Sequence, residues 1–359
     1  MTAQLEIRTD GKLGIITLNR PEAINALSRE MIDGIAATLG DWAGDPQIAA
    51  VLFEGRGSRG FCAGGDVRAV RNEVLAGRPE VADAYFAAEY AMNGLIASYR
   101  KPVVAIGHGA IMGGGLGILG HARYSFALGD ARFAMPEAAI GFVSDVGVNA
   151  ILALVPLQRA LAFLLSGLTV GMGDALQLGL CDAAIDPQRL EAVRAGIAAA
   201  ARQAEPDTAL VQLMQAEGIE PGDAVLCGEA DRLAAEFAAP TVREIVRGVV
   251  ARAAGEHDLS RLATTLAGRS PTSLAAILAS HRVARSNPAV GDVLAVDLGL
   301  ASYMVRQPDF AEGVRAVLVD KDQQPLWRPA DLESVDQQII MQIVDRPLPS
   351  SASLKLPRT

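Results

Sequence analysis

The sequence predicts an α/β fold followed by a C-terminal, mostly helical region, and three observations predict it. The first 190 residues alternate between short Val-, Ile- and Phe-rich segments and longer helical patterns. The stretch Leu190–Leu300 is rich in Ala, Leu and Arg, which favours helices. Half of the 359 residues are hydrophobic, enough for a sizeable core. We expect a core over residues 1–190 and a helical region over 191–359 packed on it, because no Gly/Ser/Pro-rich linker separates them.

The strands are expected where Val/Ile/Phe-rich segments are bounded by Gly, Pro or Asp. They are Gly14–Leu18, Ala49–Phe53, Pro102–Gly107, Tyr124–Leu128 and Arg132–Met135. Segments with helical spacing lie between and after them: Arg29–Trp42, Val67–Ala76, Val81–Tyr99, Val146–Leu154 and Gln158–Leu165. Such alternation is typical of sheets covered by helices. Farther along, Pro240 and Pro271 interrupt the helical region, and Thr241 or Ser270 is expected to cap the helix that follows.

The charge and the N-terminal segment argue against several classes of partner. A net charge of −9 disfavours binding to nucleic acid or anionic membranes. No apolar run approaches the roughly 20 residues of a membrane span. The N-terminal segment lacks both the apolar region of a signal peptide and the Arg/Ser-rich character of a transit peptide. A cytoplasmic location is therefore expected.

The three cysteines and four histidines do not form the pattern of a metal site or a disulfide framework. Cys62, Cys181 and Cys227 are widely spaced without a CxxC pair, and no two histidines have HxH or HxxxH spacing. We therefore expect neither a metal nor a cofactor. Cys62 stays open as a nucleophile, although a small buried cysteine is the more common state.

The first segment that indicates chemistry is Gly57–Asp66. It lies between a predicted strand and a predicted helix, and its glycines permit tight turns and a close approach of backbone to ligand. Asp66 is well placed to cap the helix. An amide just before such a helix start would point outward and be available to an oxyanion. The alternative is an ordinary glycine-rich connection with an aspartate cap.

The second segment is His108–Gly117, which follows a predicted strand and begins another helical run. Its adjacent glycines 113–115 expose N–H groups, and the helix dipole adds positive potential there. The spacing is neither the dinucleotide GxGxxG motif nor a Walker A loop. The alternative is a helix start that packs closely on the sheet.

The third segment is Phe133–Gly147, in which Glu137 and Asp145 lie among apolar residues. Apolar surroundings raise carboxyl pKa values and suit such groups to proton transfer. Two structural alternatives remain. Glu137 could be a first-turn helix acid after Pro136, and Asp145 could cap the helix Val146–Leu154.

Together, these three segments resemble the signature regions of the crotonase (enoyl-CoA hydratase/isomerase) superfamily, in the right order. Leu18–Pro21 and Ile24–Leu27 resemble its N-terminal signature, and Lys101-Pro102 leads into the central strand as is usual there. The resemblance implies a crotonase-like (ClpP/crotonase) spiral of ββα units.

The resemblance also implies roles for particular residues. The amides of Ala63 and Gly114 would form an oxyanion hole, and Glu137 would be the shared catalytic carboxylate. Two amides aimed at a thioester oxygen stabilise the charge that develops on it, and losing one such donor costs roughly 3–4 kcal/mol. Glu89, Gly64 and Asp66 would bind substrate.

Departures from the pattern narrow the subfamily. Gly117 stands where hydratases carry a second glutamate, which leaves Asp145 as the second acid. A Glu-plus-Asp pair resembles both dienoyl-CoA isomerases and 3-hydroxyisobutyryl-CoA hydrolases. Three C-terminal segments resemble the hydrolases specifically: Ser270–Leu274, Asp309–Asp322 and Trp327–Ala330. Val143-Ser144 departs from the Phe-Pro usual in that subfamily, which could reshape the acyl pocket.

The implied function is hydrolysis of an acyl-CoA thioester, with 3-hydroxyisobutyryl-CoA of valine catabolism as the expected substrate and coenzyme A as part of it. Glu137 would activate water or attack directly to give an anhydride, while Asp145 would hold the water or protonate the leaving thiolate. Glu89 would hold the substrate hydroxyl, unless it is a solvated helix residue.

Other functions stay open. An enoyl-CoA hydratase or dienoyl-CoA isomerase is the first alternative, and an acyl-CoA binding protein without activity is the second. For the anionic coenzyme A, Arg56, Arg59, Arg68 and Arg71 are candidate ligands, although each by itself reads as a surface charge. Crotonases often trimerise, so a homo-oligomer is also left open.

Overall fold

The computed structural model describes residues 4–346, and by packing it divides into two compact units. Unit 1 comprises the described residues up to Gly65 together with Met92–Phe133 and Val170–Ala224. Unit 2 comprises Asp66–Ala91, Ala134–Thr169 and the described residues from Val225 onward. Each unit is thus built from separate stretches of chain. The sequential division expected after residue 190 stays a prediction.

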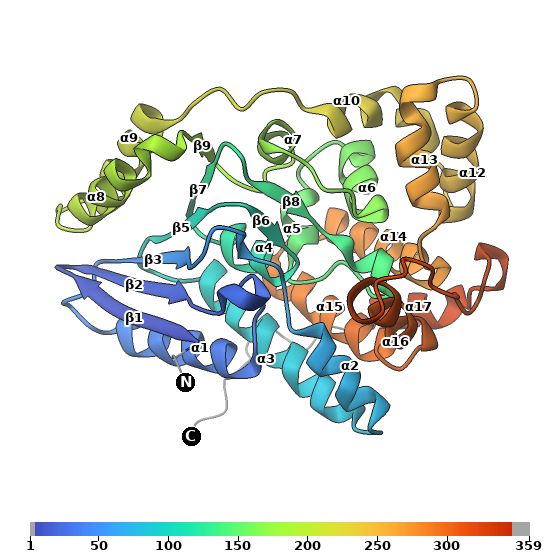
Figure 1. Ribbon diagram of the computed structural model, residues 1–359, viewed down its shortest axis with the longest axis horizontal. Coiled ribbons are helices and arrows are strands. Elements are labelled where there is room, and N and C mark those ends of the chain that lie inside the picture. Colours follow the sequence, from blue (N-terminus) through green and yellow to red (C-terminus); the bar gives the residue numbers. More distant parts are fainter. Residues whose placement is uncertain (1–3, 347–359) are drawn as a thin grey trace. The chain divides into compact units, whose positions relative to one another are not determined.

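Unit 1 contains a six-stranded sheet in the order β1-β2-β3-β5-β7-β9 (Figure 1). Its strands are β1 (Leu5–Asp10), β2 (Leu13–Leu18), β3 (Ala50–Gly55), β5 (Val103–Gly107), β7 (Tyr124–Leu128) and β9 (Ala183–Ile185). β1 pairs with β2 antiparallel, and the following pairs are parallel. Nearly every residue of β2, β3 and β5 is buried, as in parallel strands covered on both faces.

A second, smaller sheet has the order β4-β6-β8. Its strands are β4 (Gly60–Cys62), β6 (Ala110–Met112) and β8 (Arg132–Ala134), and β4 runs parallel to β6. The sequence predicted β2, β3, β5, β7 and β8 with bounds close to those observed. β1, β4, β6 and β9 were not predicted. Three of these four strands are only three residues long, which is too short for an alternating pattern to stand out.

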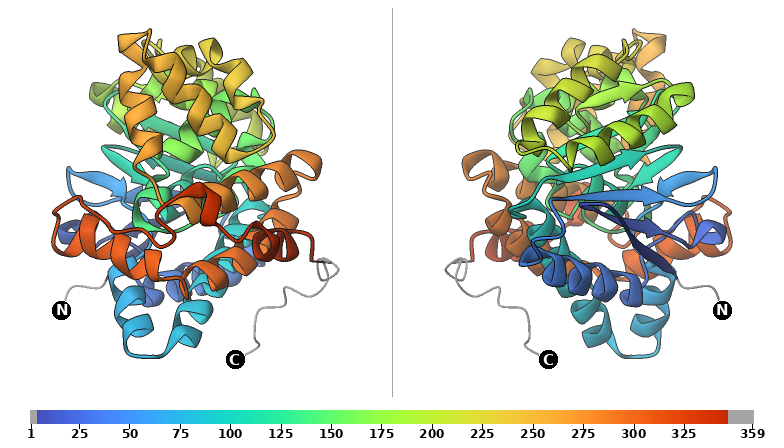
Figure 2. Two further views of the ribbon diagram at one scale, coloured as in Figure 1. Left: turned by 90° about the vertical axis from the view of Figure 1, so that its right-hand side faces the viewer. Right: turned by 90° about the vertical axis from the view of Figure 1, so that its left-hand side faces the viewer.

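Unit 1 has five complete helices among the described residues. They are α1 (Arg29–Ala43), α4 (Gly114–Leu119), α7 (Met172–Gln177), α8 (Leu190–Ala200) and α9 (Pro206–Glu217), with short turns η1 (Pro21–Ala23) and η3 (Pro187–Arg189). Of these helices, α1, α4, α8 and α9 pack against its large sheet. Helices α8 and α9 lie side by side (Figure 2). Their Val193, Ile197 and Leu210 join the sheet residues in one buried cluster. A sheet covered by helices is what the alternation of strand and helix patterns predicted.

Unit 2 is mostly helical. Helix α3 (Pro79–Ala97) contributes its residues up to Ala91, and the other elements are α2 (Val67–Leu75), η2 (Pro136–Ile140), α5 (Val148–Leu152), α6 (Leu157–Ser166), α10 (Val225–Arg232), α11 (Ala234–Phe237), α12 (Val242–Ala253), η4 (His257–Leu259), α13 (Ser260–Ala267), α14 (Pro271–Ser286), α15 (Val290–Met304), α16 (Pro308–Val314), η5 (Arg315–Val319), η6 (Leu332–Ser334) and α17 (Gln337–Val344). Helix α14 is central, since it contacts α5, α6, α12, α15 and α17.

Three helix caps predicted from the sequence are confirmed. The side chains of Asp66, Thr241 and Ser270 each accept a hydrogen bond from a first-turn amide of α2, α12 and α14, respectively. These caps are local features, so a short stretch of sequence suffices to predict them.

The predicted start of the helix after Asp145 was wrong. Helix α5 begins at Val148, and its N-cap is Gly147, so Asp145 does not cap it. Val146 and Gly147 have φ of 53° and 74°, and this left-handed backbone delays the helix.

No helix within residues 4–346 combines the length and apolar character that a membrane span requires.

Candidate active site

In unit 1, the two glycine-rich segments lie next to each other. β4 and β6 are neighbours in the small sheet, so the turns that follow them start side by side. A Cβ built on Gly64 would lie 3.6 Å from the amide nitrogen of Gly114. A Cβ on Gly115 would lie 2.5 Å from the carbonyl oxygen of Cys62. A side chain at position 115 would therefore collide with backbone, and the positive φ of Gly64 also favours glycine.

The amides available at this junction differ from those expected. The Ala63 amide donates to the carbonyl oxygen of Ile24 at 2.9 Å, so it is not free to bind an oxyanion and its predicted role was wrong. Gly64 has a φ of 104°, so the peptide that carries the Gly65 amide turns away from the Ile24 carbonyl. The amides of Gly65 and Gly114 have no hydrogen-bond partner among residues 4–346. The Gly114 amide is the first of α4, where no intrahelical acceptor exists.

Gly64 and Cys62 have structural roles at the same turn. The Gly64 carbonyl accepts from the Leu27 amide at 2.8 Å. The Cys62 thiol is fully buried and donates to the carbonyl oxygen of Asn25 at 3.2 Å, which favours the structural interpretation over a nucleophile. The predicted contact of Gly64 with substrate stays a prediction.

In unit 2, the acidic side chains of Glu89, Glu137 and Asp145 are buried, as are those of Asp297 and Asp309. Glu89 lies on α3, Glu137 in the first turn of η2 and Asp145 on the loop before α5, with exposed fractions of 2%, 6% and 4%. The Tyr90 hydroxyl donates to Asp145 Oδ2 at 2.5 Å. Oxygen atoms Oε1 of Glu89 and Oε2 of Glu137 have no partner in the part of the chain that the structure describes.

Burial changes the acidity of these groups. The loss of hydration raises the pKa of Glu89 and of Glu137 well above the ordinary value, and the nearby charge of Asp145 adds to the effect. Burial raises the pKa of Asp145 to about 7, against the lowering effect of the Tyr90 hydrogen bond. The Tyr90 hydrogen bond thus favours the ionised form of Asp145, while burial favours the protonated form of Glu137.

The chain matches the model of the enoyl-CoA hydratase/isomerase family over residues 13–344. It belongs to this family. Its relatives include the human protein named 3-hydroxyisobutyryl-CoA hydrolase, mitochondrial, which is 33% identical over 91% of this chain and 85% of its own length. The protein of the same name from Xenopus tropicalis is 34% identical over 92% of this chain and 86% of its own length.

Solved structures of the family share the fold. A carnitinyl-CoA dehydratase from Mycobacterium thermoresistibile superposes with a TM-score of 0.87 and 30% identity, covering 98% of this chain and 99% of its own. An enoyl-CoA hydratase from Rhodobacter sphaeroides has a TM-score of 0.85 and 31% identity, with 96% and 97% covered. The predicted crotonase-like fold is thereby confirmed.

Several residues that the family resemblance singled out also have defined environments. Glu89 is buried, so it is not a solvated helix residue. Asp66 accepts from the Ala69 amide at 3.2 Å as the cap of α2, and its own amide donates to the Tyr85 hydroxyl at 3.2 Å. A substrate contact of Asp66 stays a prediction.

The four candidate arginines all have partners. Arg56 forms an ion pair with Glu6 at 2.5 Å, and Arg59 donates to two carbonyls of η1. In unit 2, Arg68 and Arg71 donate to backbone carbonyls of η5 and α16. Their expected binding of coenzyme A phosphates stays a prediction.

Within residues 4–346, no three His, Cys, Asp or Glu side chains are grouped so that they could hold a metal ion.

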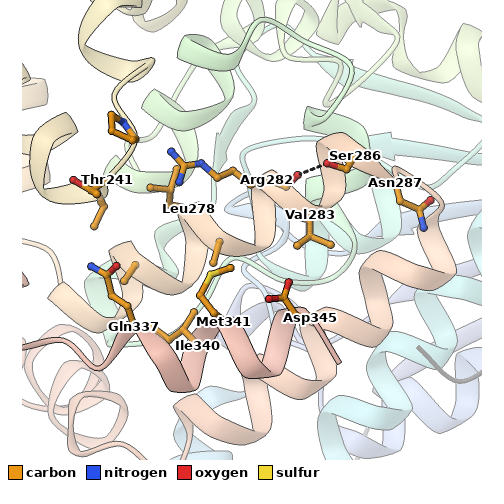
Figure 3. Close-up of a pocket in the computed structure, with 14 residues that line it drawn as sticks. Thr241, Leu278, Arg282, Val283, Ser286, Asn287, Gln337, Ile340, Met341 and Asp345 are labelled. Carbon is orange, nitrogen blue, oxygen red and sulfur yellow. Dashed lines mark hydrogen bonds between the residues drawn. The ribbon is translucent and has the colours of Figure 1, made fainter. Parts of the chain in front are cut away.

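A pocket of about 460 Å³ lies between α14, α17 and the start of α12 (Figure 3). Leu278, Ile340 and Met341 line it together with Arg282 and Asp345, and none of the buried acids does.

Proposed function

We propose that this chain hydrolyses the thioester of a short 3-hydroxyacyl-CoA, with 3-hydroxyisobutyryl-CoA of valine catabolism as the substrate. The observation that carries the proposal is the pair of buried acids Glu137 and Asp145, the latter bound to Tyr90. The names of the vertebrate relatives support it. Gly117 lies inside α4, where the family pattern of hydratases has a second glutamate, so the groups for adding water to a double bond are incomplete.

In the proposed reaction, water adds across the acyl–sulfur bond, so that its hydroxyl goes to the acyl carbon and a proton goes to the coenzyme A sulfur. The amides of Gly65 and Gly114 donate to the carbonyl oxygen as it gains negative charge. Each such donor is worth about 3–4 kcal/mol. Amides need no proton transfer for this role.

The Glu137–Asp145 pair carries one proton between two carboxyl groups. The ionised member accepts a proton from water, and the protonated member gives its proton to the departing thiolate. The pair again holds one proton at the end, so the cycle balances. The raised pKa of Glu137 and the value of about 7 for Asp145 support this distribution at neutral pH.

A labelling experiment detects an anhydride formed by Glu137 when water attacks the anhydride at the Glu137 carbon. In a single turnover in ¹⁸O-water, direct attack places the label in the product acid. Attack of water on the Glu137 carbon of an anhydride leaves the label in Glu137, which peptide mass spectrometry detects.

Glu89 is proposed to bind the 3-hydroxyl group of the substrate. Its Oε1 atom is buried without a partner among residues 4–346, and such an atom gains a hydrogen bond when a hydroxyl arrives. Glu89→Ala should reduce the preference for 3-hydroxyisobutyryl-CoA over isobutyryl-CoA about tenfold in kcat/KM, the equivalent of about 1.4 kcal/mol. An unchanged preference would remove Glu89 from substrate recognition.

The test of the proposal is a substrate panel. Release of the free thiol from 3-hydroxyisobutyryl-CoA is measured beside the absorbance changes of crotonyl-CoA and a dienoyl-CoA. The proposal predicts thiol release at a kcat/KM at least a hundredfold above hydration of crotonyl-CoA or isomerisation of the diene. The solved structures named as a dehydratase and a hydratase favour hydration as the second candidate. Faster hydration of crotonyl-CoA would establish it.

A further inference from the structure

The loop that carries Asp145 has a strained backbone. The Val148 amide donates to the Asp145 carbonyl at 3.1 Å, which closes a turn whose two central residues are Val146 and Gly147. Their φ values are 53° and 74°. A β-branched residue at positive φ is a genuine outlier, because its Cβ crowds the backbone there. Such strain persists only where the surroundings over-determine the conformation.

Buried polar side chains bind this turn at both ends. Asp297 on α15 accepts from the Gly147 amide through Oδ2 at 2.9 Å. Asn149 donates through Nδ2 to the Ser144 carbonyl at 3.1 Å. Asp297, Asn149 and Ser144 are all fully buried. These two hydrogen bonds therefore hold the backbone on either side of Asp145.

Asn149 is itself oriented by a histidine. His281 on α14 is fully buried, and its Nδ1 lies 3.0 Å from Asn149 Oδ1. Burial lowers the pKa of His281 to about 4, so at neutral pH the uncharged ring can donate through Nδ1 to that oxygen. This bond fixes the amide so that its nitrogen faces the Ser144 carbonyl.

We infer that Asp297 and Asn149 are positioning residues, which hold the strained turn and thereby keep the Asp145 carboxyl on the Tyr90 hydroxyl. Asp297 lies among apolar residues of α15, with Ser280 of α14 as a polar neighbour, and its Oδ1 has no hydrogen-bond partner within the described chain. An apolar residue of similar size would avoid that cost. The predicted effect on kcat rests on the proposed function. The predicted position of the Asp145 carboxyl does not depend on it.

The test compares two substitutions of Asp297. Asp297→Asn keeps an oxygen acceptor for the Gly147 amide, and we expect kcat and KM within about threefold of the parent values. Asp297→Leu removes the acceptor, and we expect kcat to fall about a hundredfold with KM within threefold, because a small displacement of a reacting group costs that much. Asn149→Ala releases the other end of the turn and should act in the same direction.

A crystal structure of Asp297→Leu supplies a readout without turnover. The bond between the Tyr90 hydroxyl and Asp145 Oδ2 should be broken in it and intact in Asp297→Asn. An intact bond in Asp297→Leu, or an equal loss of kcat in both variants, overturns the inference. If the parent protein does not release thiol, the proposed function fails, and this bond still decides the inference. If Asp297→Leu does not fold, Asn149→Ala is judged by the same bond and the same kinetic criteria.

Discussion

At the scale of single residues, Tyr90 governs how the buried acids share charge. Its hydroxyl bonds to Asp145 and to neither glutamate, so the ionised state is stabilised at one carboxyl of three. The groups that interact electrostatically with Asp145 are Glu89 and Tyr90 from α3, Glu137 from η2 and Asp297 from α15. The sequence indicated the acids through their apolar neighbours, but it did not indicate Tyr90, because a tyrosine on a helix is usually a core residue.

Removal of the Tyr90 hydroxyl should move the pH dependence of turnover. In Tyr90→Phe, the Asp145 carboxylate loses a donor worth about 1.5–3 kcal/mol, so its pKa rises above about 7. The acid limb of the kcat profile should shift to higher pH by about one to two units, with activity recovering in alkaline buffer. The measurement is kcat from pH 5.5 to 9.5. Tyr99→Phe is the control, since its hydroxyl bonds to the Leu39 carbonyl instead. A shift in both variants, or in neither, contradicts this role.

At the residue scale, the sequence also failed where a distant partner decides the local backbone. From the sequence, Asp145 could be a helix cap, because the residues after it have a helical pattern. In the structure, Val146 has a positive φ, and the turn is bound by Asp297, far along the chain. Ala63 and Gly65 show the same difficulty, because the pairing of Ala63 with Ile24 decides which amide remains available. Only the glycine pattern of the turn was visible in the sequence.

At the scale of elements, the C-terminal segment supports the turn that carries Glu137. Helix α16 packs on η2 so closely that a Cβ on Gly313 would lie 2.3 Å from the carbonyl carbon of Ile140. A Cβ on Gly141 would lie 2.1 Å from the carbonyl oxygen of Asp309. Asp309 also accepts from Ser270 at 2.6 Å, so two segments that resembled the hydrolase subfamily meet beside η2. Their resemblance therefore has a packing explanation.

Gly313→Ala should separate α16 from η2. The added methyl group meets backbone atoms, which cannot rotate away, so we expect a loss of about 1–3 kcal/mol of stability and a lower kcat through displacement of Glu137. Gly228→Ala is the matched control in another helix, because nothing lies within 4 Å of its Cβ. That substitution should leave kcat unchanged and stabilise by up to about 1 kcal/mol. Thermal unfolding and kcat measure both. Equal behaviour of the two variants would refute the packing argument.

At the element scale, the long helices and buried strands were the most predictable features. β7 was predicted with its observed bounds, and α1 within one residue, because continuous apolar runs and helical spacing are strong local signals. β1 was missed because its last four residues are all exposed, so the strand lacks an alternating burial pattern although every residue pairs with β2. The three-residue strands depend on pairing with distant segments, which no local pattern reveals.

At the scale of the whole molecule, the fold class and family followed from the sequence, but the assembly of each unit did not. Each unit combines separate stretches of chain, and such packing depends on long-range contacts. The cytoplasmic location, the absence of a cofactor and the oligomeric state stay predictions. The names of the relatives include the word mitochondrial, which describes those proteins.

The buried acids should make stability depend on pH in a specific direction. The folded-state pKa of Glu89 is raised, so its favourable contribution is present below its unfolded pKa near 4 and is lost as pH rises through the folded value. Because this loss begins above pH 4, Glu89→Gln should gain stability relative to the parent between pH 4 and pH 8. Denaturant unfolding at both pH values measures this.

The control for that experiment is an exposed glutamate. The hydrogen bond from Arg78 lowers the pKa of Glu73, which gives the opposite sign. Glu73→Gln should therefore show no gain at pH 8. A gain of similar size in both variants would mean that burial is not the cause.

The most direct test of the account is turnover of Glu137→Gln on 3-hydroxyisobutyryl-CoA. The account predicts that kcat for thiol release falls at least a hundredfold, because proton transfer by a positioned carboxyl contributes about 10²–10⁴-fold. Binding of the same ester, measured by calorimetry on the inactive variant, should stay within about tenfold of the parent KM. Thiol release at the parent rate would contradict the assignment of this carboxyl to the reaction.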